Sequence, residues 1–128
     1  MDILSSNSEL LLEKSMGFLW TKQAAILDNI ANIETPNYKA KTVTFEESLR
    51  DRLESAGRAS APRKAVREIL EDAEFAVFEP QEAVRMDEND VNITEQSVEM
   101  IRNAYQMQYV MQSINNNLSL LQTVVRGQ

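Results

Sequence analysis

The stretch MIRNAYQMQYVMQSINNNLSLLQTVV, residues 100–125, decides the fold, because its apolar residues recur in alternating steps of four and three. This spacing predicts one long helix with an uninterrupted apolar seam. Asn92 followed by Glu95 has the spacing of a capping box, and Thr94 is an alternative N-cap, so we expect the helix to begin near residues 93–95. The seam consists of Met100, Ala104, Met107, Met111, Ile114, Leu118, Leu121 and Val125.

The N-terminal part of the chain predicts a second long helix with the same repeat. Its seam is interrupted by one polar residue, Gln23. Pro36 disfavours helical geometry at Thr35, so the helix is expected to end near Asn32. The seam consists of Leu12, Met16, Leu19, Gln23, Ile26, Ile30 and Ile33.

These helices predict a mainly α fold in which long N- and C-terminal helices pair as a coiled-coil-like bundle, with a small β-hairpin and irregular segment between them. We divide this single structural unit into residues 1–40, 41–91 and 92–128. Each helix also has apolar residues off its seam, which a two-helix hairpin cannot bury, so we expect other copies or other proteins to cover them. These residues are Leu11, Phe18, Trp20 and Leu27 in the first helix and Ile101, Tyr105, Tyr109, Val110, Leu120 and Val124 in the second.

The middle of the chain predicts short elements. Residues 41–46 alternate and favour an extended segment, residues 47–53 a short helix, residues 55–62 a loop, and residues 63–74 another short helix. Residues 75–79 and 83–87 are predicted to form two strands of a small hairpin that turns at Pro80 and projects from the helical body. Disorder over residues 50–80 is the alternative.

Composition excludes several functions. The chain has no cysteine and no histidine, so it lacks thiolate nucleophiles, disulfides and the commonest metal ligands. The net charge of −7 argues against nucleic-acid binding, which needs clustered basic residues. Charge is uneven: residues 1–40 carry 3 − 5 = −2, residues 41–90 carry 8 − 13 = −5, and residues 91–128 carry 2 − 2 = 0. A neutral helix whose polar residues are amides is suited to burial against neighbours.

No catalytic, cofactor-binding or metal-binding site is predicted. The acidic run that begins at Asp87 fails as a calcium loop, because Val91 and Val98 occupy ligand positions and Asn92 takes the place of the turn glycine. No phosphate-binding glycine loop is present, and no stretch is apolar enough for direct insertion into a bilayer. An enzyme is therefore not expected.

The segment NIANIETPNYKA, residues 29–40, predicts a specific turn after the first helix. Pro36 sets the φ angle of the first central position, and Asn37 tolerates the positive φ that a type II turn needs at the second. Tyr38 is then expected to pack back against the end of the helix.

This segment resembles the signature N-I-A-N-x-x-T-P-G-Y of the flagellar rod and hook axial proteins, with Asn37 in place of the glycine. Residues 39–47 and 85–93 are similar to the segments that follow in proximal rod members, although Glu88 replaces a glycine and Asp90 an asparagine. The resemblance covers about residues 10–50 and 75–125. The residues that match the signature are Asn29, Ile30, Ala31, Asn32, Thr35, Pro36, Asn37 and Tyr38.

The resemblance implies a structural subunit of the proximal rod, which assembles helically through its terminal helices, connects the MS ring to the rest of the rod and transmits torque. The implied partners are further copies, other rod subunits, the rod–MS-ring adaptor, the MS ring and the flagellar type III export apparatus. Export without a cleaved signal peptide would place the protein outside the inner membrane, in the periplasm of a Gram-negative host. The alternative is a soluble helical adaptor or export chaperone that binds amphipathic segments in a methionine-rich groove.

The two seams are the expected assembly interface. Its residues are Leu12, Met16, Leu19, Ile26, Ile30, Ile33, Met100, Met107, Met111, Ile114, Leu118, Leu121 and Val125.

Overall fold

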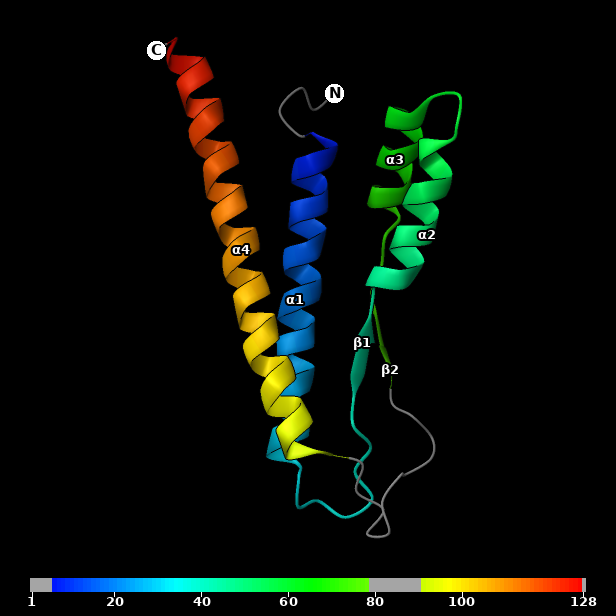
Figure 1. Ribbon diagram of the computed structural model, residues 1–128, viewed down its shortest axis with the longest axis vertical. Helices are drawn as coiled ribbons and strands as arrows, with labels where there is room; N and C mark the ends of the chain where they lie inside the picture. The colour runs from blue at the N-terminus through cyan, green and yellow to red at the C-terminus, as the bar shows by residue number, and fades with distance from the viewer. Residues whose placement is uncertain (1–5, 79–90, 128) are drawn as a thin grey trace.

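The computed structural model describes residues 6–78 and 91–127 and confirms the mainly α fold. The elements follow the order α1 (Asn7–Ala31), β1 (Thr42–Thr44), α2 (Glu46–Gly57), α3 (Pro62–Glu71), β2 (Ala76–Phe78) and α4 (Ile93–Arg126). Figure 1 shows α1 between two partners: α4 runs antiparallel along one side, and the α2–α3 hairpin covers the other. The long terminal helices therefore pair as predicted.

The ends of both long helices follow from local sequence. Ser6 caps α1, and its hydroxyl accepts a hydrogen bond from the Glu9 amide while the Glu9 carboxylate accepts one from the Ser6 amide. The predicted end near Asn32 is confirmed, because Ala31 is the last residue of α1. The predicted start of α4 is confirmed too, since Asn92 caps Ile93–Arg126 by accepting from the amides of Thr94 and Glu95.

The middle segment is more ordered over its described residues than the sequence indicated. The helix expected over residues 47–53 extends to Gly57, so the loop expected over residues 55–62 shrinks to residues 58–61. Ala56 is buried in the α2–α3 contact, and this packing carries the helix further than its own sequence predicted. The disorder alternative does not hold for residues 50–78.

The strand predicted at residues 75–79 pairs with a different strand from the one expected. The strand expected at residues 75–79 is present as β2, but β2 pairs antiparallel with β1, with Val43 opposite Val77. The strand predicted at residues 83–87 lies outside the described residues. The described partner of β2 is thus distant in sequence, because the α2–α3 hairpin returns the chain beside β1 (Figure 1).

The core lies where α1 meets the middle segment. Phe18, Phe45 and Phe75 form a three-ring cluster with centroid separations of 5.1, 6.4 and 6.2 Å, one pair stacked and two edge-to-face. Leu49 of α2 and Leu70 of α3 are buried beside these rings. The middle segment is therefore part of the core rather than a projection, and it covers Phe18, which a two-helix hairpin would leave without a partner.

Two polar side chains of α1 attach the α2–α3 hairpin to it through three hydrogen bonds. The Lys14 ammonium donates to the carbonyl oxygens of Glu71 (3.2 Å) and Ala73 (3.1 Å) at the end of α3. The Asn7 amide donates to the carbonyl oxygen of Arg63 (2.9 Å) at its beginning. The hairpin is thus held parallel to α1 at both ends of α3.

Candidate functional site

The inward face of α4 keeps the half-buried Met107 and Ile114 of the predicted seam, but it is shifted by one residue at its fully buried positions. Its buried residues are Asn103 and Val110, whereas the predicted seam had Ala104 and Met111 at these positions. Asn103 hydrogen-bonds to α1, and Val110 belongs to the core cluster, so both side chains point toward α1. The shift shows that the apolar pattern alone did not decide which face of α4 turns inward.

The predicted interface residues consequently lie in three environments. Leu19 and Ile26 are buried between α1 and its neighbours. Three residues of α4 are exposed: Met111 (48%), Leu118 (51%) and Val125 (80%). The half-buried residues are Leu12, Met16, Ile30, Ile33, Met100, Met107, Ile114 and Leu121.

Ala104, Met111, Leu118 and Val125 form an exposed line along α4, at intervals of seven residues, which we call the outer stripe. Residues 103–125 contain no charged side chain, so α4 itself places no charge beside the stripe. A helix exposed to water on this face is usually covered by glutamate and lysine. The outer stripe therefore has the chemistry of a contact surface.

A groove continues the outer stripe across to α1. We call it the end groove; it measures about 800 Å³ and is lined by α1 residues such as Met16 and Trp20 and by α4 residues such as Leu121. It exists because α4 leans away from α1 toward its C-terminus (Figure 1). Trp20 is 61% exposed at its edge. The remaining lining residues are Glu9, Leu12, Glu13, Gly17, Ile114, Asn117, Leu118 and Val125.

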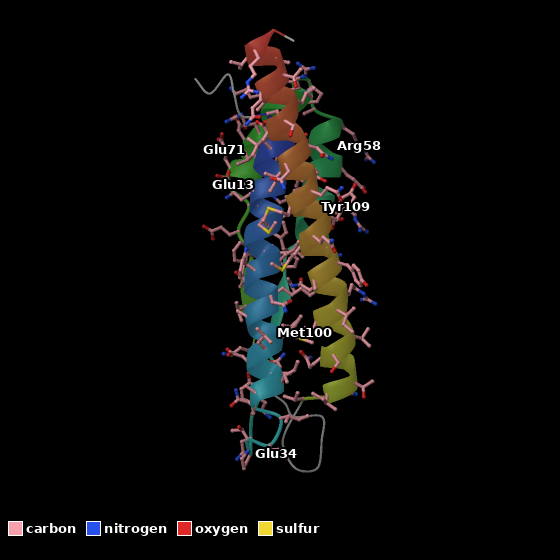
Figure 2. All side chains as sticks on the ribbon, turned by 90° about the vertical axis from the view of Figure 1, so that its left-hand side faces the viewer. Glu13, Glu34, Arg58, Glu71, Met100 and Tyr109 are labelled. Atoms are coloured by element: carbon pink, nitrogen blue, oxygen red, sulfur yellow. The ribbon has the colours of Figure 1, made fainter. Side chains whose placement is uncertain are left out.

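A second groove of about 650 Å³ lies between α1, α2 and α4. Tyr105 and Tyr109 of α4 form one wall and are 70% and 72% exposed, while Leu49 and Leu53 of α2 belong to the other. Figure 2 shows Tyr109 on the side of α4 away from α1, the same side of the molecule as Arg58 of α2. Apolar surface is thus open on both flanks of α4.

The residues that carry the family resemblance form the corner after α1. Asn29 is 1% exposed and uses both hydrogens and both lone pairs of its side-chain amide. Its nitrogen donates to the Lys41 carbonyl (2.9 Å) and the Gln96 side-chain oxygen (3.0 Å). Its oxygen accepts from the Lys41 amide (2.7 Å) and the Tyr38 hydroxyl (3.2 Å). One side chain therefore joins α1, the turn, the approach to β1 and the beginning of α4.

The predicted turn is confirmed. The Tyr38 amide donates to the Thr35 carbonyl (3.3 Å), and Asn37 has a φ of 61°. Asn32 stabilises the residues just before this turn, because its side-chain oxygen accepts a hydrogen bond from the Thr35 hydroxyl (3.0 Å). Of the signature residues, Asn29, Asn32, Thr35, Pro36, Asn37 and Tyr38 thus build the corner; Ala31 is exposed and Ile30 is half-buried beside it.

The positive φ at Asn37 gives a testable expectation. Asn37→Gly should leave the free energy of unfolding within about 0.5 kcal/mol of the parent, because glycine adopts this conformation without strain. Asn37→Val should lower it by about 1–2 kcal/mol, since a β-branched residue is strained there. Urea unfolding followed by circular dichroism measures both, and equal stability of the two variants would contradict the turn geometry.

The corner and the grooves offer no catalytic constellation among residues 6–78 and 91–127. No group of three or more acidic, histidine or cysteine side chains is placed to hold a metal ion in this part of the chain. Within the same residues, no helix is long and apolar enough to cross a membrane. The charged groups near α4 form pairs such as Lys22–Glu99 (3.1 Å) and Arg102–Glu99 (2.7 Å).

Sequence reasoning missed Asn103 as an inward residue. It is 0% exposed, and its amide nitrogen donates to the Leu19 carbonyl (3.0 Å) and the Gln23 side-chain oxygen (2.7 Å). Gln23 was the one signal available, because a polar residue inside an apolar seam implies a polar partner on the facing helix.

Comparison with known proteins shows which proteins this chain resembles. No protein-family profile matches the chain. It is 28% identical over 120 residues to the flagellar basal body rod protein FlgB of Bacillus subtilis, covering 91% of both chains. It is 46% identical over 39 residues to FlgB of Borrelia hermsii, which is 30% of this chain and 29% of that protein.

Both relatives are rod proteins of the flagellar basal body, so the predicted resemblance to the flagellar rod and hook axial proteins is confirmed. Two long terminal helices and a corner built by the signature residues agree with that class. Within that class, the chain is similar over 91% of its length to the basal body rod protein FlgB. Its relatives thus support a component of the flagellar basal body rod with a structural role.

Proposed function

We propose that this chain is a structural subunit of the proximal rod that assembles helically through α1 and α4. The observation that carries the proposal is the outer surface of α4, which is uncharged over residues 103–125 and where apolar side chains remain exposed on the sides that α1 does not cover. A single copy leaves this surface in water, and burying it gives a favourable free energy of about 25 cal/mol per Å² of apolar area. Neighbouring copies and other rod subunits are the proposed partners.

The dimensions of the molecule suit a load-bearing element. With 34 residues, α4 is about 50 Å long at 1.5 Å per residue, and α1 supports it over part of this length. Helices packed along their length resist bending together, which is what torque transmission from the MS ring through the rod requires. We further propose contact with the rod–MS-ring adaptor and passage through the type III export apparatus to a site outside the inner membrane.

A deletion strain tests the proposal. Without the gene, basal bodies should stop before the rod forms, cells should be non-motile, and expression of the chain from a plasmid should restore both. An affinity-tagged copy should then co-purify with isolated basal bodies. Complete rods in the deletion strain would contradict the proposal, and retention of the tagged protein in the cytoplasm would favour the adaptor or chaperone alternative.

A further inference from the structure

The contact between Gln23 and Asn103 forms a polar layer in the middle of the α1–α4 interface. Leu19, Ile26 and Val110, which flank it, are buried apolar residues. The Asn103 nitrogen has two hydrogens, and these reach the Leu19 carbonyl (3.0 Å) and the Gln23 oxygen (2.7 Å), while the Met107 sulfur lies at 3.6 Å. The layer therefore links the backbone and a side chain of α1 to one position of α4.

The orientation of the Asn103 amide follows from the backbone of α1. Rotating the amide by 180° would bring its oxygen against the Leu19 carbonyl oxygen, and a carbonyl cannot donate. In the observed orientation, the Asn103 oxygen is buried without a hydrogen-bond partner among the described residues. Burying this unpaired oxygen costs free energy that an apolar pair would not cost. Stability alone therefore does not explain why the interface contains a polar layer.

What the layer does explain is the choice between two faces of α4. The side of α4 with Ala104, Met111 and Leu118 has the more continuous apolar pattern. These residues lie about 100° around the helix from Asn103 and Val110, and the half-buried Met107 and Ile114 lie between the two sets. If α4 turned its more apolar face inward, Gln23 would lose the Asn103 amide and face apolar side chains. A heptad slip along α1 has the same effect, because Gln23 is the single polar residue of the α1 seam.

We infer that the Gln23–Asn103 layer determines specificity in α1–α4 pairing: it directs the less apolar face of α4 inward and thereby reserves the outer stripe for a neighbouring copy. The inference rests on the proposed function for the use of the stripe, but the choice of face is a property of the monomer. A buried polar residue that selects one pairing at the expense of stability is an established device in coiled coils. Here it selects a helix face.

Cysteine reporters test the choice of face, because the chain has no cysteine of its own. Met111→Cys lies on the outer stripe, and Val110→Cys lies on the inward face. In an otherwise unchanged monomer, we expect the Met111→Cys thiol to be alkylated at least about ten-fold faster than the Val110→Cys thiol, since a protected group reacts through local opening. In the Gln23→Leu/Asn103→Leu background, this ratio should fall below about three-fold as α4 also samples the rotated face.

Two control backgrounds keep the experiment decisive. Gln112→Leu/Asn116→Leu makes the same chemical change, one glutamine and one asparagine to leucine, at exposed positions of α4 and should leave the ratio unchanged. Gln23→Asn/Asn103→Gln keeps a polar pair and should retain most of the ratio, even if its stability is lower. If the ratio of alkylation rates is unchanged in the Gln23→Leu/Asn103→Leu background, the inference is wrong and the Gln23–Asn103 contact is an ordinary hydrogen bond.

The assembly readout separates this inference from the proposed function. If the ratio of alkylation rates falls and cells that carry Gln23→Leu/Asn103→Leu also lose motility, the result supports both the inference and the proposed function. If the ratio falls while motility is normal, the polar layer still selects the face, but the outer stripe is not the assembly surface.

Discussion

Met111→Asp should abolish rod assembly and motility while leaving the isolated chain folded. Met111 is 48% exposed on the outer stripe, so an aspartate is hydrated in the monomer and lowers its stability little. Against a neighbouring copy, the same carboxylate would be buried without a cation, because residues 103–125 have no basic side chain to pair with it. Burial of an unpaired charge costs several kcal/mol, and helical assembly repeats that cost at every subunit contact.

The measurements are swarming of a deletion strain that expresses the variant, electron microscopy of its basal bodies, and circular dichroism of the purified chain. Gln112→Asp is the matched control, because Gln112 is the adjacent exposed residue of α4 and lies about 100° around the helix from Met111. Met111→Leu should behave as the parent. Normal motility of the Met111→Asp strain would remove the outer stripe from the assembly surface.

Asn29→Ala should lower the free energy of unfolding by about 3 kcal/mol, the largest effect on stability that we expect from one polar side chain. The substitution removes four hydrogen bonds at once, including those to the Lys41 amide and carbonyl, in a part-buried corner. For a chain of this size, the change corresponds to a fall in melting temperature of about 10 °C.

Urea unfolding and thermal melting measure the effect. Asn115→Ala is the control, since Asn115 is exposed in the middle of α4 and is expected to change stability by less than about 0.5 kcal/mol. A loss below about 1 kcal/mol for Asn29→Ala would mean that water replaces the amide in the corner, and that Asn29 does not hold the end of α1 to the beginning of α4.

The place of Asn29 in a motif was visible in the sequence, but its burial was not. The sequence marked it as part of a family signature and explained the turn that follows, because proline and a residue tolerant of positive φ act locally. Its burial could not be predicted, since two of its partners, Lys41 and Gln96, are 12 and 67 residues away along the chain. This signature asparagine therefore connects the end of α1 to the beginning of α4, a role that can be seen only in the folded structure.

In the middle segment too, local sequence predicted the short helices, whereas their extent and the strand pairing depend on contacts between distant residues. The propensities for short helices near residues 47–53 and 63–74 were visible, but the extent of α2 depends on the burial of Ala56 against α3. The partner of β2 was predicted from proximity in sequence, whereas the hairpin of α2 and α3 brings the distant β1 beside it.

The sequence by itself determined the two terminal helices, their ends and the turn at Asn37, because caps, proline and apolar periodicity act within a few residues. Tertiary structure decided which face of α4 is buried. Periodicity ranks the faces by apolar content and favours the one with Met111, but the buried face must also satisfy Gln23, and Asn103 does so. The hydrogen bond from Asn103 reaches across the interface to a residue 80 positions away along the chain, which periodicity cannot reveal, and the face with Met111 stays exposed.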